Sequence, residues 1–104
     1  MSIDPSTFVV LFSNDVTKFV FKEVLKNRSA MFKEIRESLS KKPEFSALDN
    51  STLEETVRKL KDADLIKERT APIEDFNTYY VTADGLTAER QLRLAEPLTA
   101  SSSS

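Results

Sequence analysis

Side chains that could do covalent or metal chemistry are scarce in this sequence. The 104 residues include no Cys and no His, which excludes thiol nucleophiles, disulfides, the usual zinc ligands and imidazole catalysis. Ser51 and Thr52 therefore have no imidazole base, and the single glycine cannot form a glycine-rich phosphate loop. The neighbouring acids at 54–55 and 74–75 do not share a helix face. We expect no catalytic residue, no bound metal and no cofactor.

The stretch 51–69 is the most regular part of the chain. Its apolar residues recur at i, i+4 and i+7 and form one stripe of a helix: Leu53, Val57 and Leu60. Ser51 followed three residues later by Glu54 matches a capping box, so this helix should begin near Ser51. At Ala63-Asp64 the period changes from helical to two, and one left-handed residue there would end the helix.

A β-hairpin should follow this helix. Alternation over 65–70 predicts one strand, the Pro and Asn of 70–77 predict a loop, and TYYVT at 78–82 predicts a second strand. Thr82 is then expected to be the N-cap of a C-terminal helix. The apolar face of that helix should contain three leucines: Leu86, Leu92 and Leu94.

Upstream, the pattern predicts further helices. Asp4 followed by Pro5 resembles an N-cap and a first helical position. A broad apolar face over 15–26 predicts a central helix, and 30–41 predicts a shorter helix. The face of the shorter helix has apolar residues four apart: Met31, Ile35 and Leu39. Two short helices joined by the polar segment 43–50 form a helix-turn-helix pattern.

Length and composition predict one domain with one core, since 39% of the residues are hydrophobic. We expect this domain to span residues 1–97 and residues 98–104 to form a disordered polar tail. The longest uncharged apolar run near the start, at 8–12, is too short for a signal or membrane segment, so we expect a cytoplasmic protein. Apolar segments at 8–12 and 86–94 could cover the core or meet a second copy, and we predict a two-fold dimer.

This order of elements resembles a winged helix-turn-helix domain, a mostly helical α+β fold. Such a domain has a three-helix core, a two-stranded β-hairpin wing and a C-terminal helix. LEETVRKLKDADLIKER is similar to the recognition-helix-to-wing passage of MarR/ArsR-type transcription regulators. YYVTADGLTAERQL resembles the second wing strand and the Thr-x-x-Gly turn after it. The family usually has Gly at the position of Asp64, although Asp tolerates left-handed geometry better than most residues.

The resemblance implies a transcription regulator that binds double-stranded DNA as a homodimer. The helix at 51–63 would enter the major groove, and the hairpin at 65–82 would be the wing. Basic side chains could reach phosphates or guanine edges, and hydroxyls could reach phosphates or bases. The implied DNA-binding residues are Ser51, Thr52, Glu55, Thr56, Arg58, Lys59, Lys33, Lys41, Lys42 and Arg69.

The charge distribution leaves a second function open. Residues 1–42 hold eight basic and five acidic residues, whereas residues 43–104 hold seven and twelve. The segment 51–69 balances at five basic and five acidic residues, and the wing tip has Glu74 and Asp75. Carboxylates repel phosphates, so the alternative is a winged-helix module that binds protein and not DNA.

Two apolar residues flank the acids of the wing tip. Ile73 and Phe76 are expected to fold back on the core, and their other possible role is in a protein-binding surface.

Overall fold

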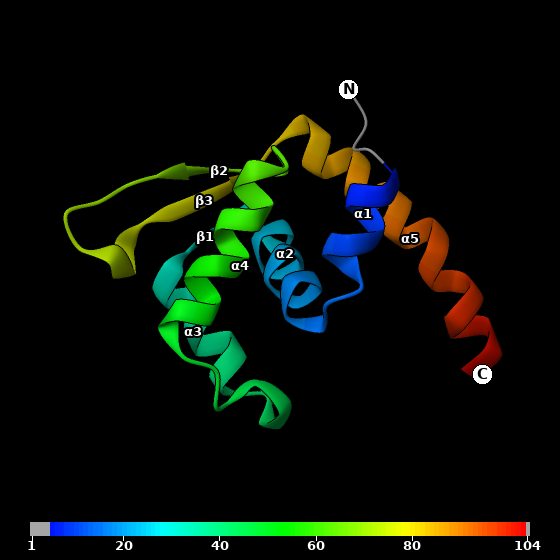
Figure 1. The fold of residues 1–104 in the computed structure, drawn as a ribbon, viewed down its shortest axis with the longest axis horizontal. Helices are drawn as coiled ribbons and strands as arrows, with labels where there is room; N and C mark the ends of the chain where they lie inside the picture. The colour runs from blue at the N-terminus through cyan, green and yellow to red at the C-terminus, as the bar shows by residue number, and fades with distance from the viewer. Residues whose placement is uncertain (1–4, 104) are drawn as a thin grey trace.

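The computed structural model describes the backbone of residues 5–103 and the side chains of Ser6 and of residues 8–94 (Figure 1). Helices α2, α3 and α4 pack together, a small sheet adjoins them, and the β2–β3 hairpin projects to one side. The elements in chain order are α1 (Pro5–Phe12), α2 (Asp15–Lys26), β1 (Ser29–Met31), α3 (Phe32–Ser40), the 3₁₀ turn η1 (Pro43–Phe45), α4 (Asn50–Asp62), β2 (Ile66–Arg69), the 3₁₀ turn η2 (Glu74–Phe76), β3 (Thr78–Val81) and α5 (Ala83–Ser103). This is the winged helix-turn-helix architecture that the sequence predicts.

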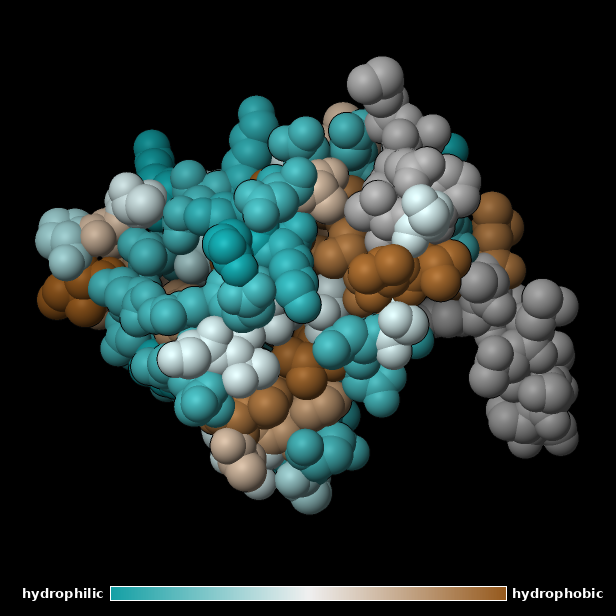
Figure 2. Space-filling view, in the orientation of Figure 1, coloured by the Kyte–Doolittle hydropathy of each residue, from teal (hydrophilic) through white to brown (hydrophobic). Residues whose placement is uncertain are grey.

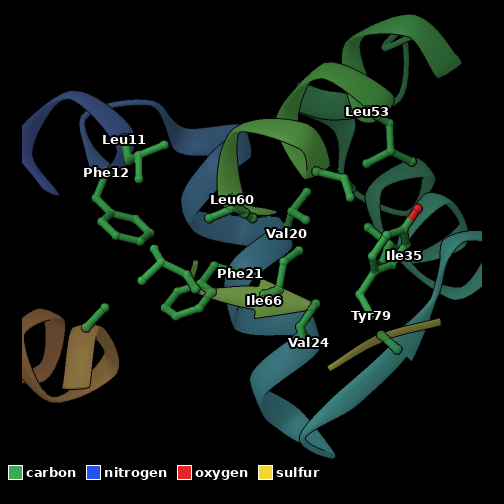
Figure 3. Packing of buried hydrophobic residues seen from close by; sticks show 14 of the residues in the cluster. Leu11, Phe12, Val20, Phe21, Val24, Ile35, Leu53, Leu60, Ile66 and Tyr79 are labelled. Carbon is green, nitrogen blue, oxygen red and sulfur yellow. The ribbon is translucent and has the colours of Figure 1, made fainter. Parts of the chain in front are cut away.

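The core lies between α2, α4 and the sheet (Figure 3). Helix α2 begins where the Asn14 side chain accepts hydrogen bonds from the amides of Val16 and Thr17. Fully buried side chains from several elements meet in this core: Val20, Phe21, Val24, Phe32, Ile35, Leu60, Leu65 and Ile66. The apolar stripe predicted for α4 is confirmed, since Leu53, Val57 and Leu60 are at most 2% exposed.

The predicted two-stranded hairpin is confirmed as β2 and β3, and a third strand, β1, that was not predicted joins it in one sheet. Its order is β1-β3-β2, and both pairings are antiparallel. Strand β1 has only three residues, too few for alternation to reveal them, and it follows Arg28 in left-handed geometry at φ 65°. Helix α3 consequently begins at Phe32, and Phe32 takes the buried position predicted for Met31. The amide of Met31 donates instead to the Glu34 carboxylate at 2.8 Å.

Helix α4 begins earlier than predicted because a different residue caps it. The Asp49 carboxylate accepts the Thr52 amide at 2.9 Å, and α4 starts at Asn50. The proposed capping box between Ser51 and Glu54 is therefore wrong. The Thr52 hydrogen bond also lowers the pKa of Asp49, since it favours the ionised carboxylate.

The junction between α4 and the sheet confirms the predicted left-handed turn. Asp64 has φ 62°, and the Leu65 amide then donates to the Leu60 carbonyl at 3.1 Å. Thr82 caps α5 as expected, because its hydroxyl accepts the Gly85 amide at 2.9 Å. A Cβ on Gly85 would lie 2.3 Å from the Leu65 carbonyl oxygen, so α5 packs directly on the strand backbone. Glycine is needed here for close approach.

The apolar face of α5 differs from the prediction. Ala88 and Leu92 are buried, whereas Leu86 is 39% and Leu94 is 72% exposed. Helix α5 begins one residue after Thr82 and packs on β3, which turns the Ala88 side of the helix inward. Its backbone helix extends to Ser103, and the disordered tail over 98–104 stays a prediction because no side chain beyond Leu94 is described.

Helix α1 is only partly buried. Leu11 and Phe12 lie in the core, and the Phe12 ring contacts the rings of Phe8 and Phe21 at centroid distances of 5.0 and 5.3 Å. Val9 and Val10, in contrast, are 64% and 72% exposed. The predicted N-cap Asp4 lies outside the described residues.

Candidate nucleic-acid interface

The outer face of α4 is polar, and Figure 2 shows a largely hydrophilic surface over this helix. Five of the residues predicted to contact DNA are exposed on it: Ser51, Thr52, Glu55, Arg58 and Lys59. They occupy the positions opposite the buried stripe, so one helix face anchors α4 and the other presents hydrogen-bonding groups. The exposed side chains offer hydrogen-bond donors and acceptors, and α4 as a whole has three basic and three acidic residues.

Thr56 does not lie on this exposed face. The residue is 6% exposed, and its hydroxyl donates to the Thr52 carbonyl at 2.8 Å, so the prediction that it contacts DNA was wrong. Thr56 precedes Val57 and falls on the edge of the buried stripe, where α4 packs against α2. A threonine satisfies its hydroxyl within the helix when it is buried in this way.

Arg58 is paired within its own helix. Its Nη2 lies 2.6 Å from both carboxylate oxygens of Glu55. Both side chains are about half exposed, at 61% and 48%, and pairs in such settings contribute roughly 0–1 kcal/mol. The arginine can therefore exchange Glu55 for a phosphate or a base edge at small cost.

Lys59 lies where two surface grooves meet. One groove, of about 470 Å³, runs between α1 and the end of α4 and is lined by Val10, Leu11 and Ala63 among others. The second, of about 280 Å³, runs between the start of α2 and the start of α4. Lys59 lines both, and no ion pair holds it in the described part of the chain. Its ammonium group is thus available to an anion.

The other predicted cations are spread over the neighbouring elements. Lys41 and Lys42 are exposed just after α3, and the Lys42 ammonium lies 5.6 Å from the Phe19 ring centroid. Lys33, at the start of α3, lies 6.0 Å from the ring centroid of Phe76. Arg69 is exposed at the end of β2. The structure therefore groups five predicted residues on α4 and leaves these four around it.

The wing tip differs from its prediction. Ile73 is 58% and Phe76 is 48% exposed, so the expectation that both fold back on the core was wrong. The tip contacts α3 instead, because Asp75 Oδ1 accepts from Arg36 Nη1 at 2.7 Å. This hydrogen bond and the guanidinium charge lower the pKa of Asp75, and the same bond raises the pKa of Arg36. Sequence reasoning missed Arg36, since 39 residues separate the partners.

A second acidic contact opposes the first. The Glu54 carboxyl, through a hydrogen bond and its like charge, raises the pKa of Glu74. The wing tip therefore meets a cation on α3 and a carboxylate at the start of α4.

Other kinds of site are not present in what the structure describes. Among residues 5–103 no group of three potential acidic ligands could hold a metal ion, and none of the helices there is long and apolar enough to cross a membrane.

Comparison with known proteins supports the fold. No family model matches the chain, and no curated protein is significantly similar to it. An ArsR family transcriptional regulator has a TM-score of 0.62 at 15% identity, over 100% of this chain and 99% of its own. Bordetella bronchiseptica BpsR, whose DNA binding is regulated by 6-hydroxynicotinic acid, has a TM-score of 0.62 at 17% identity, over 92% of this chain and 75% of its own. At these identities the likeness is one of fold.

Proposed function

We propose that the protein is a transcription regulator that binds double-stranded DNA through α4 and acts in the cytoplasm. The observation that supports this most is the exposed polar face of α4, on a fold shared with two DNA-binding or transcription-regulating proteins. Ser51 and Thr52 offer hydroxyls at the start of the helix, and Arg58 and Lys59 offer cations one to two turns later. These groups suit phosphate and guanine contacts in a major groove.

The surrounding cations would hold the DNA backbone. Lys41 and Lys42 follow α3, Lys33 lies in its first turn, and Arg69 ends the first wing strand. Phosphate contacts fix the register of a protein on a duplex, whereas base contacts give sequence preference. In this proposal Glu55 releases Arg58 on binding, and its carboxylate can accept a hydrogen bond from cytosine N4.

The proposed regulator is a homodimer, because paired half-sites require paired recognition helices. Val9 and Val10 on α1 and Leu94 on α5 are the exposed apolar residues that suit such an interface. Sedimentation at high micromolar concentration should give twice the 11.8 kDa chain mass. A monomer at that concentration would count against the dimer.

Fluorescence anisotropy with labelled duplexes tests the DNA proposal. Each phosphate contact should add about −0.9 to the slope of log K against log salt. Replacing Arg58 and Lys59 together by Glu should abolish binding and leave the circular dichroism spectrum unchanged, since both side chains are exposed. Glu55→Gln is the matched opposite change and should tighten non-specific binding, because it removes a charge that repels phosphate.

A second candidate function is a protein-binding module. The exposed Ile73 and Phe76, three residues apart at the wing tip, favour it, because exposed apolar side chains that form one patch mark interaction sites. If wild-type protein at tens of micromolar and low salt shifts no duplex from a random pool, this candidate replaces the first.

A further inference from the structure

The wing tip lies on the basic face of α3. Lys33 and Arg36 are three residues apart on this helix, which places them on one side of it. Turn η2 packs against α3, with Asp75 bonded to Arg36 and the ring of Phe76 beside Lys33. One short segment therefore engages both cations at once.

The Asp75 carboxylate accepts a hydrogen bond from Arg36 that a phosphate oxygen could accept in its place. Guanidinium groups bind carboxylates and phosphates with the same hydrogen-bond geometry. While Asp75 holds Arg36, the pair presents no net charge to an approaching polyanion. The pair is also half exposed, with side chains 36% and 41% accessible, so exchange of one anion for another costs little.

A like-charge contact opposes closure of the wing tip. Glu54 raises the pKa of Glu74 through a hydrogen bond and through its like charge, so the two carboxyl groups lie close together where the tip meets the first turns of α4. The tip is therefore held by the Asp75–Arg36 bond and the contact of Phe76 with Lys33, while the like charges of ionised Glu54 and Glu74 repel one another. A segment balanced in this way can change position when a competitor takes one partner.

We propose that the wing tip is an autoinhibitory latch, in which Asp75 masks Arg36 and duplex DNA must displace Asp75 before α3 contributes to binding. The proposal rests on the DNA-binding function above and adds a specificity-determining role for Asp75. The latch lowers affinity for phosphate alone, so it weakens non-specific binding while base contacts from α4 are unaffected.

The test compares Asp75→Asn with wild type in anisotropy titrations of a random-sequence 30-mer duplex. Release of Arg36 should tighten binding about three- to fivefold, the range that an exposed ion pair allows. It should also steepen the slope of log K against log salt by about 0.9, the value for one more phosphate.

Two further variants separate the latch from a simple change of charge. Glu44→Gln removes one exposed carboxylate from η1 and should leave the salt slope unchanged. In the double variant Arg36→Gln, Asp75→Asn the gain should disappear, since no guanidinium remains to be released. The latch is overturned if Asp75→Asn gains no more duplex affinity than Glu44→Gln does. It is also overturned if the gain in affinity persists in the double variant that lacks Arg36.

Hydrogen exchange examines the latch without DNA. Deuterium uptake of the segment 70–77 should be faster in Asp75→Asn than in Glu44→Gln, and equal uptake counts against the latch. If the wild-type protein does not bind duplex DNA and Asp75→Asn does, the latch proposal is supported, and the proposal that the wild-type chain binds DNA by itself is not. If neither binds at tens of micromolar and low salt, both proposals fail.

Discussion

Two turns of this molecule, the α4–β2 junction and the wing tip, are held by different forces. At the junction Asp64, Leu65 and Gly85 are fixed by backbone hydrogen bonds and by a contact that leaves no room for a Cβ. At the wing tip Ile73 and Phe76 face solvent, and one exposed ion pair joins Asp75 to α3. Buried backbone contacts tolerate little change, whereas exposed pairs contribute little stability.

The difference assigns separate roles to the two turns. The junction sets the angle between α4 and the sheet, so it fixes the geometry of the proposed interface. The wing tip can move without loss of the core, and segments of low local stability are those that change position on binding. Substitutions should therefore affect stability at the junction and binding at the tip.

The largest expected effect is at Leu60, whose carbonyl accepts the Leu65 amide and whose side chain is fully buried. Leu60→Ala should lower the free energy of unfolding by about 2–5 kcal/mol. Ile73→Ala, at the tip, should change it by less than about 0.5 kcal/mol. Urea titration measures both values, and a loss below half a kcal/mol at Leu60 would mean that this side chain is not in the core.

Gly85→Ala should give the next largest change in the free energy of unfolding, and the sign of that change distinguishes two effects. Helix propensity alone predicts that Gly85→Ala stabilises by about 0.8–1 kcal/mol. The close approach of the Leu65 carbonyl instead predicts a loss of about 1–3 kcal/mol, since an added methyl group forces the backbone apart. Thermal and urea unfolding would decide between them, and stabilisation would show that α5 does not pack on the strand in this way.

A substitution at Asp64 should change the free energy of unfolding by less than Gly85→Ala does, and in the opposite direction. The φ of 62° at Asp64 is strained for any residue with a Cβ, so Asp64→Gly should raise the free energy of unfolding by up to about 1 kcal/mol. Asp62→Gly is the matched control, because Asp62 is helical and exposed and glycine there should destabilise. Equal effects at the two positions would contradict a left-handed turn.

The smallest effects concern acid pH, and the start of α4 and the wing tip should respond oppositely. The pKa of Asp49 is lowered, so its contribution to stability is present above its unfolded pKa of about 3.9 and is lost as pH falls through the folded value. The pKa of Glu74 is raised, so ionisation of Glu74 reduces stability as pH rises through its folded value.

Urea titrations between pH 3 and pH 7 can separate these two carboxyls. Asp49→Asn keeps a side-chain cap, so its stability should fall less steeply than that of wild type below about pH 4. Glu74→Gln should gain stability at neutral pH and lose that gain at low pH. Parallel curves for all three proteins would show that neither carboxyl has a shifted pKa.

Local rules predicted the junction, and long-range contacts decided the wing tip. The change of period at Ala63, the left-handed residue at Asp64 and the cap at Thr82 depend on neighbours within a few residues. The partner of Asp75 is Arg36, and no local pattern links two side chains 39 residues apart. Ile73 and Phe76 were expected to be buried because they are hydrophobic. They lie at the tip of the hairpin, which does not bring them back to the core.

The candidate site shows the same limit. Helical periodicity placed Ser51, Thr52, Arg58 and Lys59 on one exposed face, but it could not resolve Thr56 at the edge of the buried stripe. Strand β1 escaped detection because its pairing with β3 spans the whole helix-turn-helix unit. The sequence therefore predicts the fold and the orientation of α4. The side-chain pairs that set the charge at the proposed interface can be identified only from the three-dimensional structure.

The exposed face of α4 is proposed to bind duplex DNA. The most direct measurement is a titration of ¹⁵N-labelled protein with a duplex selected from a random pool, followed by amide chemical shifts. If α4 binds the duplex, the amide shifts should change most at Ser51, Thr52, Arg58 and Lys59 and little at the buried Val57. Failure to select any duplex, or shifts confined to Ile73 and Phe76, would contradict it.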